Sequence, residues 1–413
     1  MDNMDNNTPA PEEKKTLSDR EVTAHTASLW KYNPVPDSPE PYPEYKNSDD
    51  TIGSARIAAA RVRGKKHKHE GTNCDDWYEF DRVGDWVIAA VSDGAGSKPL
   101  SRIGARVSCE AVISTLKTEF SAVAEMCPDI KEQLSKPFSD GEFNSVCSKL
   151  AVIMQNSFSA AFSAVENAYI ARSNKPEYEE SMGRKPEISD YSGTLLAAVM
   201  IPVCNNEHFI ISIQVGDGMI ASVNAEADFG SALRILGNAD SGAFAGETEF
   251  LTSAQAVSAD SLRSRTKIQR GKISALLLMT DGVADDYYPN NPQLLRLYLD
   301  LALNGIVDIP SGDAGAEYTP SEPVAYPWVN DSDVSYSLQY AKNIMSKNDI
   351  ALDLLWQRRG ENIVQKSTLS AYDITNGAAP SERLSVWLDN YVERGSFDDR
   401  TLLAVIVNNG EKL

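Results

Sequence analysis

Short apolar runs separated by polar turns recur along the chain from about residue 51. Five runs are rich in valine, isoleucine and leucine and are bounded by glycine, aspartate or asparagine. They cover residues 86–91, 194–203, 209–223, 273–279 and 402–407, and a Gly-Asp-Gly sequence interrupts the third. Runs of this length and composition predict β-strands that are buried on one or both faces.

Longer segments between these runs carry apolar residues at helical spacing. In residues 102–120, Val112, Leu116 and Phe120 fall on one face at i, i+4 and i+8, and residues 143–173 form an alanine-rich segment with a similar stripe. Residues 335–358 and 381–394 also have a helical pattern, with Ser381 after Pro380 as a candidate cap for the second. The mixture predicts an α+β architecture in which helices cover sheets.

Two segments lack this periodicity. Residues 1–50 are polar and rich in proline, so they cannot bury enough apolar surface to offset the entropy of ordering, and we predict a flexible tail. Residues 304–334 are rich in Gly, Pro, Ser and Asp. We therefore predict a single domain over residues 51–413, with a loop-rich and helical insertion near 304–360.

Composition narrows the class of protein. The net charge of −20 argues against nucleic acid as a partner, because phosphate backbones require a basic surface. No apolar run reaches the roughly 18 residues that a membrane helix needs. The five cysteines have no zinc spacing and form no disulfide framework, and the polar N-terminus does not resemble a signal peptide. We expect a cytoplasmic protein without membrane or nucleic-acid partners.

Acidic turns follow the apolar runs. Asp93 and Asp281 follow such runs, and Asp217 lies in the Gly-Asp-Gly sequence that interrupts the third run. Each of the three is followed by glycine, and Asp285 lies one turn beyond Asp281. A fourth acidic turn, Asp398-Asp399, leads into the last run. Asp-Gly is also a common turn dipeptide, so one such turn alone indicates little.

The recurrence of these turns favours a metal site. Ionised carboxylates beside a core are costly to desolvate unless a cation compensates, and three of the four turns have no basic residue nearby in the sequence. Mg²⁺ and Mn²⁺ prefer carboxylate, backbone carbonyl and water ligands. Gly94 has no Cβ, so its carbonyl could approach such an ion.

The order of these motifs resembles that of the metal-dependent protein phosphatases of the 2C type, especially their compact bacterial branch. The matching segments, in chain order, are residues 64–67 (Gly-Lys-Lys-His), 74–76 (Cys-Asp-Asp), 92–97 (Ser-Asp-Gly-Ala-Gly-Ser), 192–194 (Ser-Gly-Thr), 215–218 (Val-Gly-Asp-Gly), 246–251, 280–285 (Thr-Asp-Gly-Val-Ala-Asp) and 398–401 (Asp-Asp-Arg-Thr). Each is short, but the ordered set runs from about residue 60 to 408.

The resemblance implies a four-layer α-β-β-α sandwich, in which helices flank two antiparallel sheets, and a protein serine/threonine phosphatase activity. It implies two Mn²⁺ or Mg²⁺ ions. Asp93 would bridge them, the Gly94 carbonyl and Asp76 would serve one, and Asp281 and Asp398 would hold the other. Asp217, with Asp281 and Asp285, would form a weaker third site. The implied partner is a phosphorylated protein, with a cognate kinase.

The chain departs from the family pattern at three positions. Asp75 stands where the family has glutamine or glutamate. Asp399 replaces the closing asparagine, so Asp398 is the expected ligand by its spacing to Thr401, with Asp399 as the alternative. Many members bind phosphate through an arginine at the position that is Gly71 here. His67, or a basic neighbour such as Lys66, is the candidate replacement, and His67 is also a candidate catalytic acid.

Other chemistries fit less well. No cysteine is followed six residues later by arginine, no Asp-x-Asp-x-Thr follows a strand, and no Gly-x-x-x-x-Gly-Lys loop is present. His67 and His69 could share a face as zinc ligands, but the lysines around them would repel a cation. A catalytically weak pseudophosphatase or signalling scaffold, and a phosphohydrolase for small molecules, remain the alternatives to a protein phosphatase.

Overall fold

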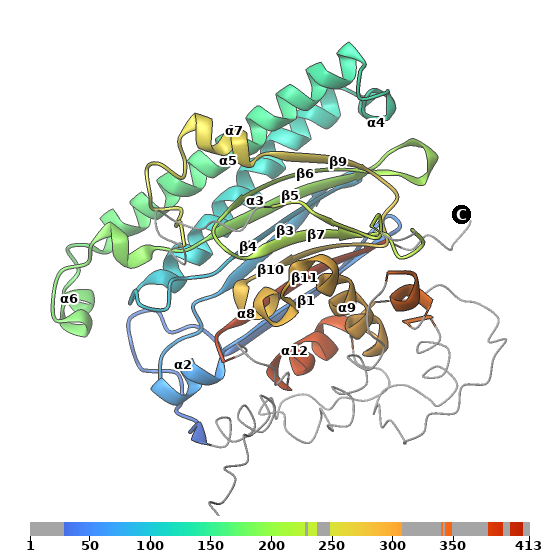
Figure 1. The fold of residues 1–413 in the computed structure, drawn as a ribbon. Coiled ribbons are helices and arrows are strands. Elements are labelled where there is room, and N and C mark those ends of the chain that lie inside the picture. Colours follow the sequence, from blue (N-terminus) through green and yellow to red (C-terminus); the bar gives the residue numbers. More distant parts are fainter. Residues whose placement is uncertain are drawn as a thin grey trace, which may run out of the picture.

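The computed structural model describes residues 29–227, 230–237, 248–307, 340–341, 343–348, 379–390 and 397–407. Two antiparallel sheets lie face to face in its centre (Figure 1). The first has the order β1 (Tyr45–Ile52), β2 (Ala55–Val62), β11 (Arg400–Val407), β10 (Ala275–Met279), β7 (Met219–Val223), β8 (Leu233–Ile235). The second has the order β3 (Trp77–Val83), β4 (Trp86–Ser92), β5 (Leu195–Pro202), β6 (His208–Val215), β9 (Lys267–Gly271).

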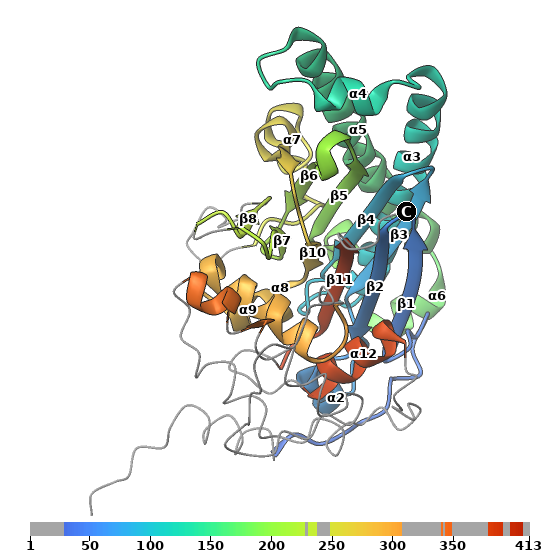
Figure 2. The ribbon, with the colours of Figure 1, turned by 90° about the vertical axis from the view of Figure 1, so that its right-hand side faces the viewer.

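Helices cover the outer face of each sheet (Figures 1 and 2). The long helices α3 (Ser101–Met126) and α5 (Gly141–Arg172) pack on the second sheet, and α9 (Asn290–Leu303) and α12 (Pro380–Asn390) pack on the first. The shorter helices are α2 (Lys65–Glu70), α4 (Ile130–Ser135), α6 (Pro176–Met182), α7 (Ala259–Arg265) and α8 (Asp281–Ala284). The four-layer α-β-β-α sandwich is therefore confirmed.

Three apolar clusters correspond to the three interfaces between layers. Ile57, Val91, Leu196 and Leu278 belong to the cluster between the sheets, and each is fully buried. The other two clusters join each sheet to its helices. Since the central strands pack on both faces, they need apolar side chains at almost every position, which is why they are continuous apolar runs in the sequence.

The predicted runs correspond to β4, β5, β6 with β7, β10 and β11. The sequence pattern missed the edge strands and also the interior strand β2. β1 begins at Tyr45, inside the segment predicted as a tail, and pairs with β2 along its whole length. β1 lies at the edge of the sheet, so its side chains are mostly half-buried and polar. The sequence of β1 therefore contains no apolar run. The predicted helix 335–358 and insertion 304–360 lie mostly outside the described residues.

Candidate functional site

The acidic turns converge because the strands that carry them are neighbours in register. Met279 at the end of β10 pairs with Met219 at the start of β7 and with Leu402 near the start of β11. The turns that carry Asp281, Asp217 and Asp398 therefore meet at one end of the first sheet. Asp93 arrives at the same place from β4: carboxylate oxygens of Asp93, Asp217 and Asp281 lie within 4.8 Å of one another.

Close backbone packing holds these turns together. A Cβ on Gly94 would lie only 2.6 Å from the carbonyl oxygen of Asp75, and a Cβ on Gly64 would lie 2.2 Å from the carbonyl carbon of Asp398. The Asp93 amide donates to Thr194 Oγ1 over 2.9 Å. Glycine is therefore required at both positions, because any side chain would displace a neighbouring acidic loop.

Burial and mutual repulsion disfavour the ionised form of the carboxylates in the acidic cluster. Burial, followed by the charges of Asp281 and Asp76, raises the pKa of Asp93. Burial and the charges of Asp217 and Asp398 raise the pKa of Asp281 to about 6, although a hydrogen bond with Asp93 opposes this. Among the described residues, no lysine or arginine forms an ion pair with Asp93, Asp217 or Asp281. The cluster has the donor set and the unbalanced charge that a divalent cation requires.

Asp76 lies behind this cluster and is completely buried. Its Oδ2 accepts hydrogen bonds from Thr401 Oγ1 at 2.6 Å and from Thr280 Oγ1 at 2.9 Å. Its Oδ1 is buried without a partner. Burial and the charge of Asp399 raise the pKa of Asp76. A buried carboxylate oxygen with no hydrogen-bond donor is costly, so it fits a position that a cation or its bound water would satisfy.

Asp399 differs from Asp76, because both of its carboxylate oxygens have hydrogen-bond partners within the protein. Oδ1 accepts from the Gly64 amide at 2.6 Å, and Oδ2 accepts from the Asp75 amide at 2.5 Å and lies 2.8 Å from His67 Nδ1. Burial would raise the pKa of Asp399, but the charge and hydrogen bond of His67 lower it below its usual value. Asp399 therefore joins α2, the start of β3 and the start of β11.

His67 is the side chain that pairs with Asp399. Burial would lower its pKa, but the charge of Asp399 and the hydrogen bond to it raise the pKa to about 10. The opposite ring nitrogen, Nε2, faces the site: it lies 3.9 Å from Asp398 Oδ1 and would be 3.5 Å from a Cβ on Gly96. The imidazole is thus a buried, cationic group at the edge of the acidic cluster.

The remaining predicted residues lie around the rim. The Asp398 side chain is 48% exposed and its Oδ1 accepts from the Asp399 amide. Asp217 accepts a hydrogen bond from Thr248 Oγ1. The surface of Asp285 is largely accessible, but partial desolvation by the surrounding protein and the charge of Asp217 raise the pKa of its carboxyl. Lys66 is half-buried, and its amide donates to the Phe397 carbonyl, next to Asp398.

The zinc alternative receives no support from the placement of His69. Its Nδ1 accepts a hydrogen bond from the Lys31 amide over 2.9 Å, and its ring packs edge-on against Trp30 at 5.1 Å. The grouping of possible ligands around His67 contains Asp75 and Asp399 but not His69, among the residues that the structure describes. The two histidines therefore do not act as a pair.

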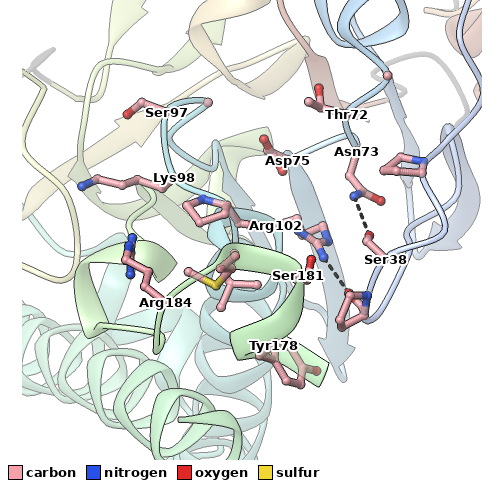
Figure 3. Close-up of a pocket in the computed structure, with 17 residues that line it drawn as sticks. Ser38, Thr72, Asn73, Asp75, Ser97, Lys98, Arg102, Tyr178, Ser181 and Arg184 are labelled. Carbon is pink, nitrogen blue, oxygen red and sulfur yellow. Dashed lines mark hydrogen bonds between the residues drawn. The ribbon is translucent and has the colours of Figure 1, made fainter. Parts of the chain in front are cut away.

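Several contributors to the site have roles that are not visible in the sequence. Asp75 is 7% exposed, and burial with the charge of Asp399 raises its pKa to about 7. Thr280 and Thr401 lie inside the quoted motifs, but nothing local in the sequence shows that both hydroxyls reach Asp76. A pocket of about 480 Å³ also opens beside Asp75 and Gly96 (Figure 3). Its walls come from segments distant in sequence, so only the fold brings them together.

No helix within the described ranges is both long enough and apolar enough to span a bilayer.

Comparison with known protein families assigns the chain to a family. The family model described as protein phosphatase 2C matches residues 63–303, more than half of the 413 residues. No curated protein matches the chain.

Similar solved structures include RsbX in complex with magnesium, at 11% identity over 88% of this chain and 100% of the other, with a TM-score of 0.35. They also include Stp1, a serine/threonine phosphatase of Staphylococcus aureus, at 11% identity over 92% and 99%, TM-score 0.33. A third is the phosphatase domain of SpoIIE from Bacillus subtilis with a fragment of its regulatory domain, at 9% identity over 89% and 66%, TM-score 0.34. At these identities and TM-scores, the assignment depends on the family model and not on the structures. The chain belongs to the protein phosphatase 2C family of metal-dependent serine/threonine phosphatases.

Proposed function

We propose that this phosphatase hydrolyses phosphoserine and phosphothreonine in protein substrates at the acidic cluster, with two Mn²⁺ or Mg²⁺ ions. The observation that supports this most is the grouping of Asp93, Asp217 and Asp281, whose oxygens lie within 4.8 Å with no cationic side chain paired to them among the described residues. Such a grouping is stable when ionised only if divalent cations balance it.

The geometry suggests how the residues would share the ions. Asp93 would bridge them, with the Gly94 carbonyl on one ion and the free Oδ1 of Asp76 facing it directly or through water. Asp281 and Asp398 would hold the other ion, and Asp217 with Asp285 would contribute to a weaker third site. We prefer Asp398 to Asp399 as a ligand, because both oxygens of Asp399 already accept hydrogen bonds from the chain.

The protein groups around the cluster would prepare the reaction. Divalent ions at the site would lower the pKa of water and offset the charge of the phosphoryl oxygens. Thr280 and Thr401 hold Asp76 in one orientation through its Oδ2. His67, kept cationic by Asp399, would attract the phosphoryl group and could donate a proton to the leaving oxygen, with Lys66 as a second phosphate contact.

The setting of the enzyme is also a proposal. We expect a phosphorylated protein partner and a cognate serine/threonine kinase, in the cytoplasm. The five cysteines are all free, which agrees with a reducing compartment.

A direct assay tests the function. Purified protein with Mn²⁺ should release phosphate from a phosphothreonine peptide, and chelation of the metal should abolish the release. Failure to act on the peptide, with Mn²⁺-dependent release from small phosphate esters, would indicate a small-molecule phosphohydrolase. Metal binding without release from either substrate would indicate a pseudophosphatase.

Metal affinity should rise with pH. The pKa of Asp93 is raised and that of Asp281 is about 6, so Mn²⁺ must displace protons from these carboxyls at low pH. We expect the dissociation constant to fall steadily between about pH 5 and pH 8, with proton release that decreases over the same range. Isothermal titration calorimetry in buffers of different ionisation enthalpy would measure both. An affinity that does not change with pH would contradict the assignment of these two ligands.

A further inference from the structure

The pocket beside the acidic cluster has a charge that contrasts with the rest of the protein. It has a volume of about 480 Å³, within the usual range of ligand pockets of about 300–1,000 Å³. Asp75 and Gly96 line it, and both lie close to residues of the acidic turns: a Cβ on Gly96 would be 3.5 Å from His67 Nε2, and a Cβ on Gly94 would be 2.6 Å from the Asp75 carbonyl oxygen. The proposed function gives the cluster a phosphorylated residue, so this pocket lies where neighbouring residues of the same substrate would pass.

Three cationic side chains line the pocket: Lys98, Arg102 and Arg184 (Figure 3). Arg184 is neutralised by a bidentate pair with Asp190, with bonds of 2.5 and 2.8 Å. Arg102 is 4% exposed and binds the carbonyl oxygens of Pro39, Glu40 and Pro99, so no carboxylate is hydrogen-bonded to its charge. Among the described residues, no hydrogen bond or close ion pair engages the ammonium group of Lys98. Burial would raise the pKa of Asp190, but the bonds from Arg184 and, after them, the charge of Lys98 lower it.

Two hydrogen bonds hold the backbone that carries Lys98. Its amide donates to the Ala95 carbonyl at 2.8 Å, and its own carbonyl accepts from Ser101 Oγ at 2.9 Å. Figure 3 shows Lys98 and Arg184 on one side of the pocket and Thr72 and Asn73 on the other, with Asp75 and Arg102 between them. The hydroxyls of Thr72, Ser97 and Ser181 add hydrogen-bond donors to these walls.

We propose that this pocket is a specificity subsite that binds an acidic side chain of the substrate, next to the phosphorylated residue, through the ammonium group of Lys98. The inference rests on the proposed function. The net charge of −20 would repel an acidic peptide, so a preference for one must come from local positive charge. Charges farther away than the Debye length of about 8 Å are largely screened at physiological salt, which leaves the pocket as the local determinant.

Two matched phosphothreonine peptides test this subsite, one with glutamate and one with glutamine on both sides of the phosphothreonine. The wild-type enzyme should have a kcat/KM about fivefold higher for the glutamate peptide, as expected for one partly exposed ion pair. Lys98→Glu should invert this ratio and Lys98→Ala should bring it near one. The control Lys149→Glu makes the same charge change on an exposed face of α5 and should keep the wild-type ratio.

The outcomes separate the two proposals. Release from both peptides without a preference in the wild type, or a preference that survives Lys98→Glu, would overturn the subsite and leave the phosphatase intact. Absence of Mn²⁺-dependent release from any substrate would contradict the proposed function. In that case fluorescence anisotropy with the same two peptides, labelled and without metal, still decides whether the pocket prefers acidic side chains in a Lys98-dependent manner.

Discussion

Asp93→Asn should reduce Mn²⁺-dependent phosphate release by at least about a thousandfold, which corresponds to about 4 kcal/mol of transition-state stabilisation. The neighbours of Asp93 include Asp281, Asp76 and Asp398, so it is well placed to contact two cations. The amide keeps the shape of the side chain but removes the charge. The measurement is kcat on a phosphothreonine peptide at saturating Mn²⁺.

The same variant should have an opposite effect on the metal-free protein. Burial and three neighbouring carboxylates disfavour the ionised form of Asp93, so its replacement removes repulsion, and the Tm without metal should rise. The gain in Tm on adding Mn²⁺ should become smaller, because the variant binds the ion less tightly. Asp260→Asn, on an exposed side chain, is the control and should change neither value. A fully active Asp93→Asn enzyme would refute the site.

Asp399→Ala should lower the free energy of unfolding by about 3–5 kcal/mol, even without metal. The substitution leaves a buried His67 without its counter-ion and leaves the amides of Gly64 and Asp75 without an acceptor. Chemical denaturation monitored by fluorescence, with chelator present, would measure the loss. Activity should fall too, because α2 and the loop before β3 lose the group that positions them.

Asp398→Ala provides the matched comparison at the adjacent residue. Its side chain is 48% exposed, so the free energy of unfolding without metal should change little. Mn²⁺ affinity and activity should nevertheless fall sharply if Asp398 is the ligand. If instead Asp398→Ala retains full Mn²⁺ affinity and Asp399→Ala folds normally but binds no metal, the two roles are exchanged.

Most of the central strands and the acidic turns were predictable because their causes are local; the exception is β2, in which Arg56 and Arg61 interrupt the apolar residues. A strand packed on both faces needs an unbroken apolar run, and the turn that follows must be polar, so the segments around Asp93, Asp217 and Asp281 are visible in the sequence. The edge strand β1 was not predictable in this way, since it is half-exposed and its pattern resembles a polar tail.

The distinction between Asp398 and Asp399 illustrates what the sequence could not decide. The two residues are chemically identical and adjacent, and spacing to Thr401 only ranks them. The fold separates them: Asp399 turns inward to Gly64, Asp75 and His67, whereas Asp398 remains half-exposed beside the cluster.

By itself, the sequence determined the buried strands, the acidic turns at their ends and the order of motifs that resembles a phosphatase family, because each depends on a few neighbouring residues. Only the tertiary structure decided which carboxylates lie together in the acidic cluster and which one, Asp399, instead accepts hydrogen bonds from other parts of the chain. It also decided that Lys98 and Arg102 line a positively charged pocket in an acidic protein. These properties depend on how strands and helices that are far apart in the chain pack together, so no local sequence pattern predicts them.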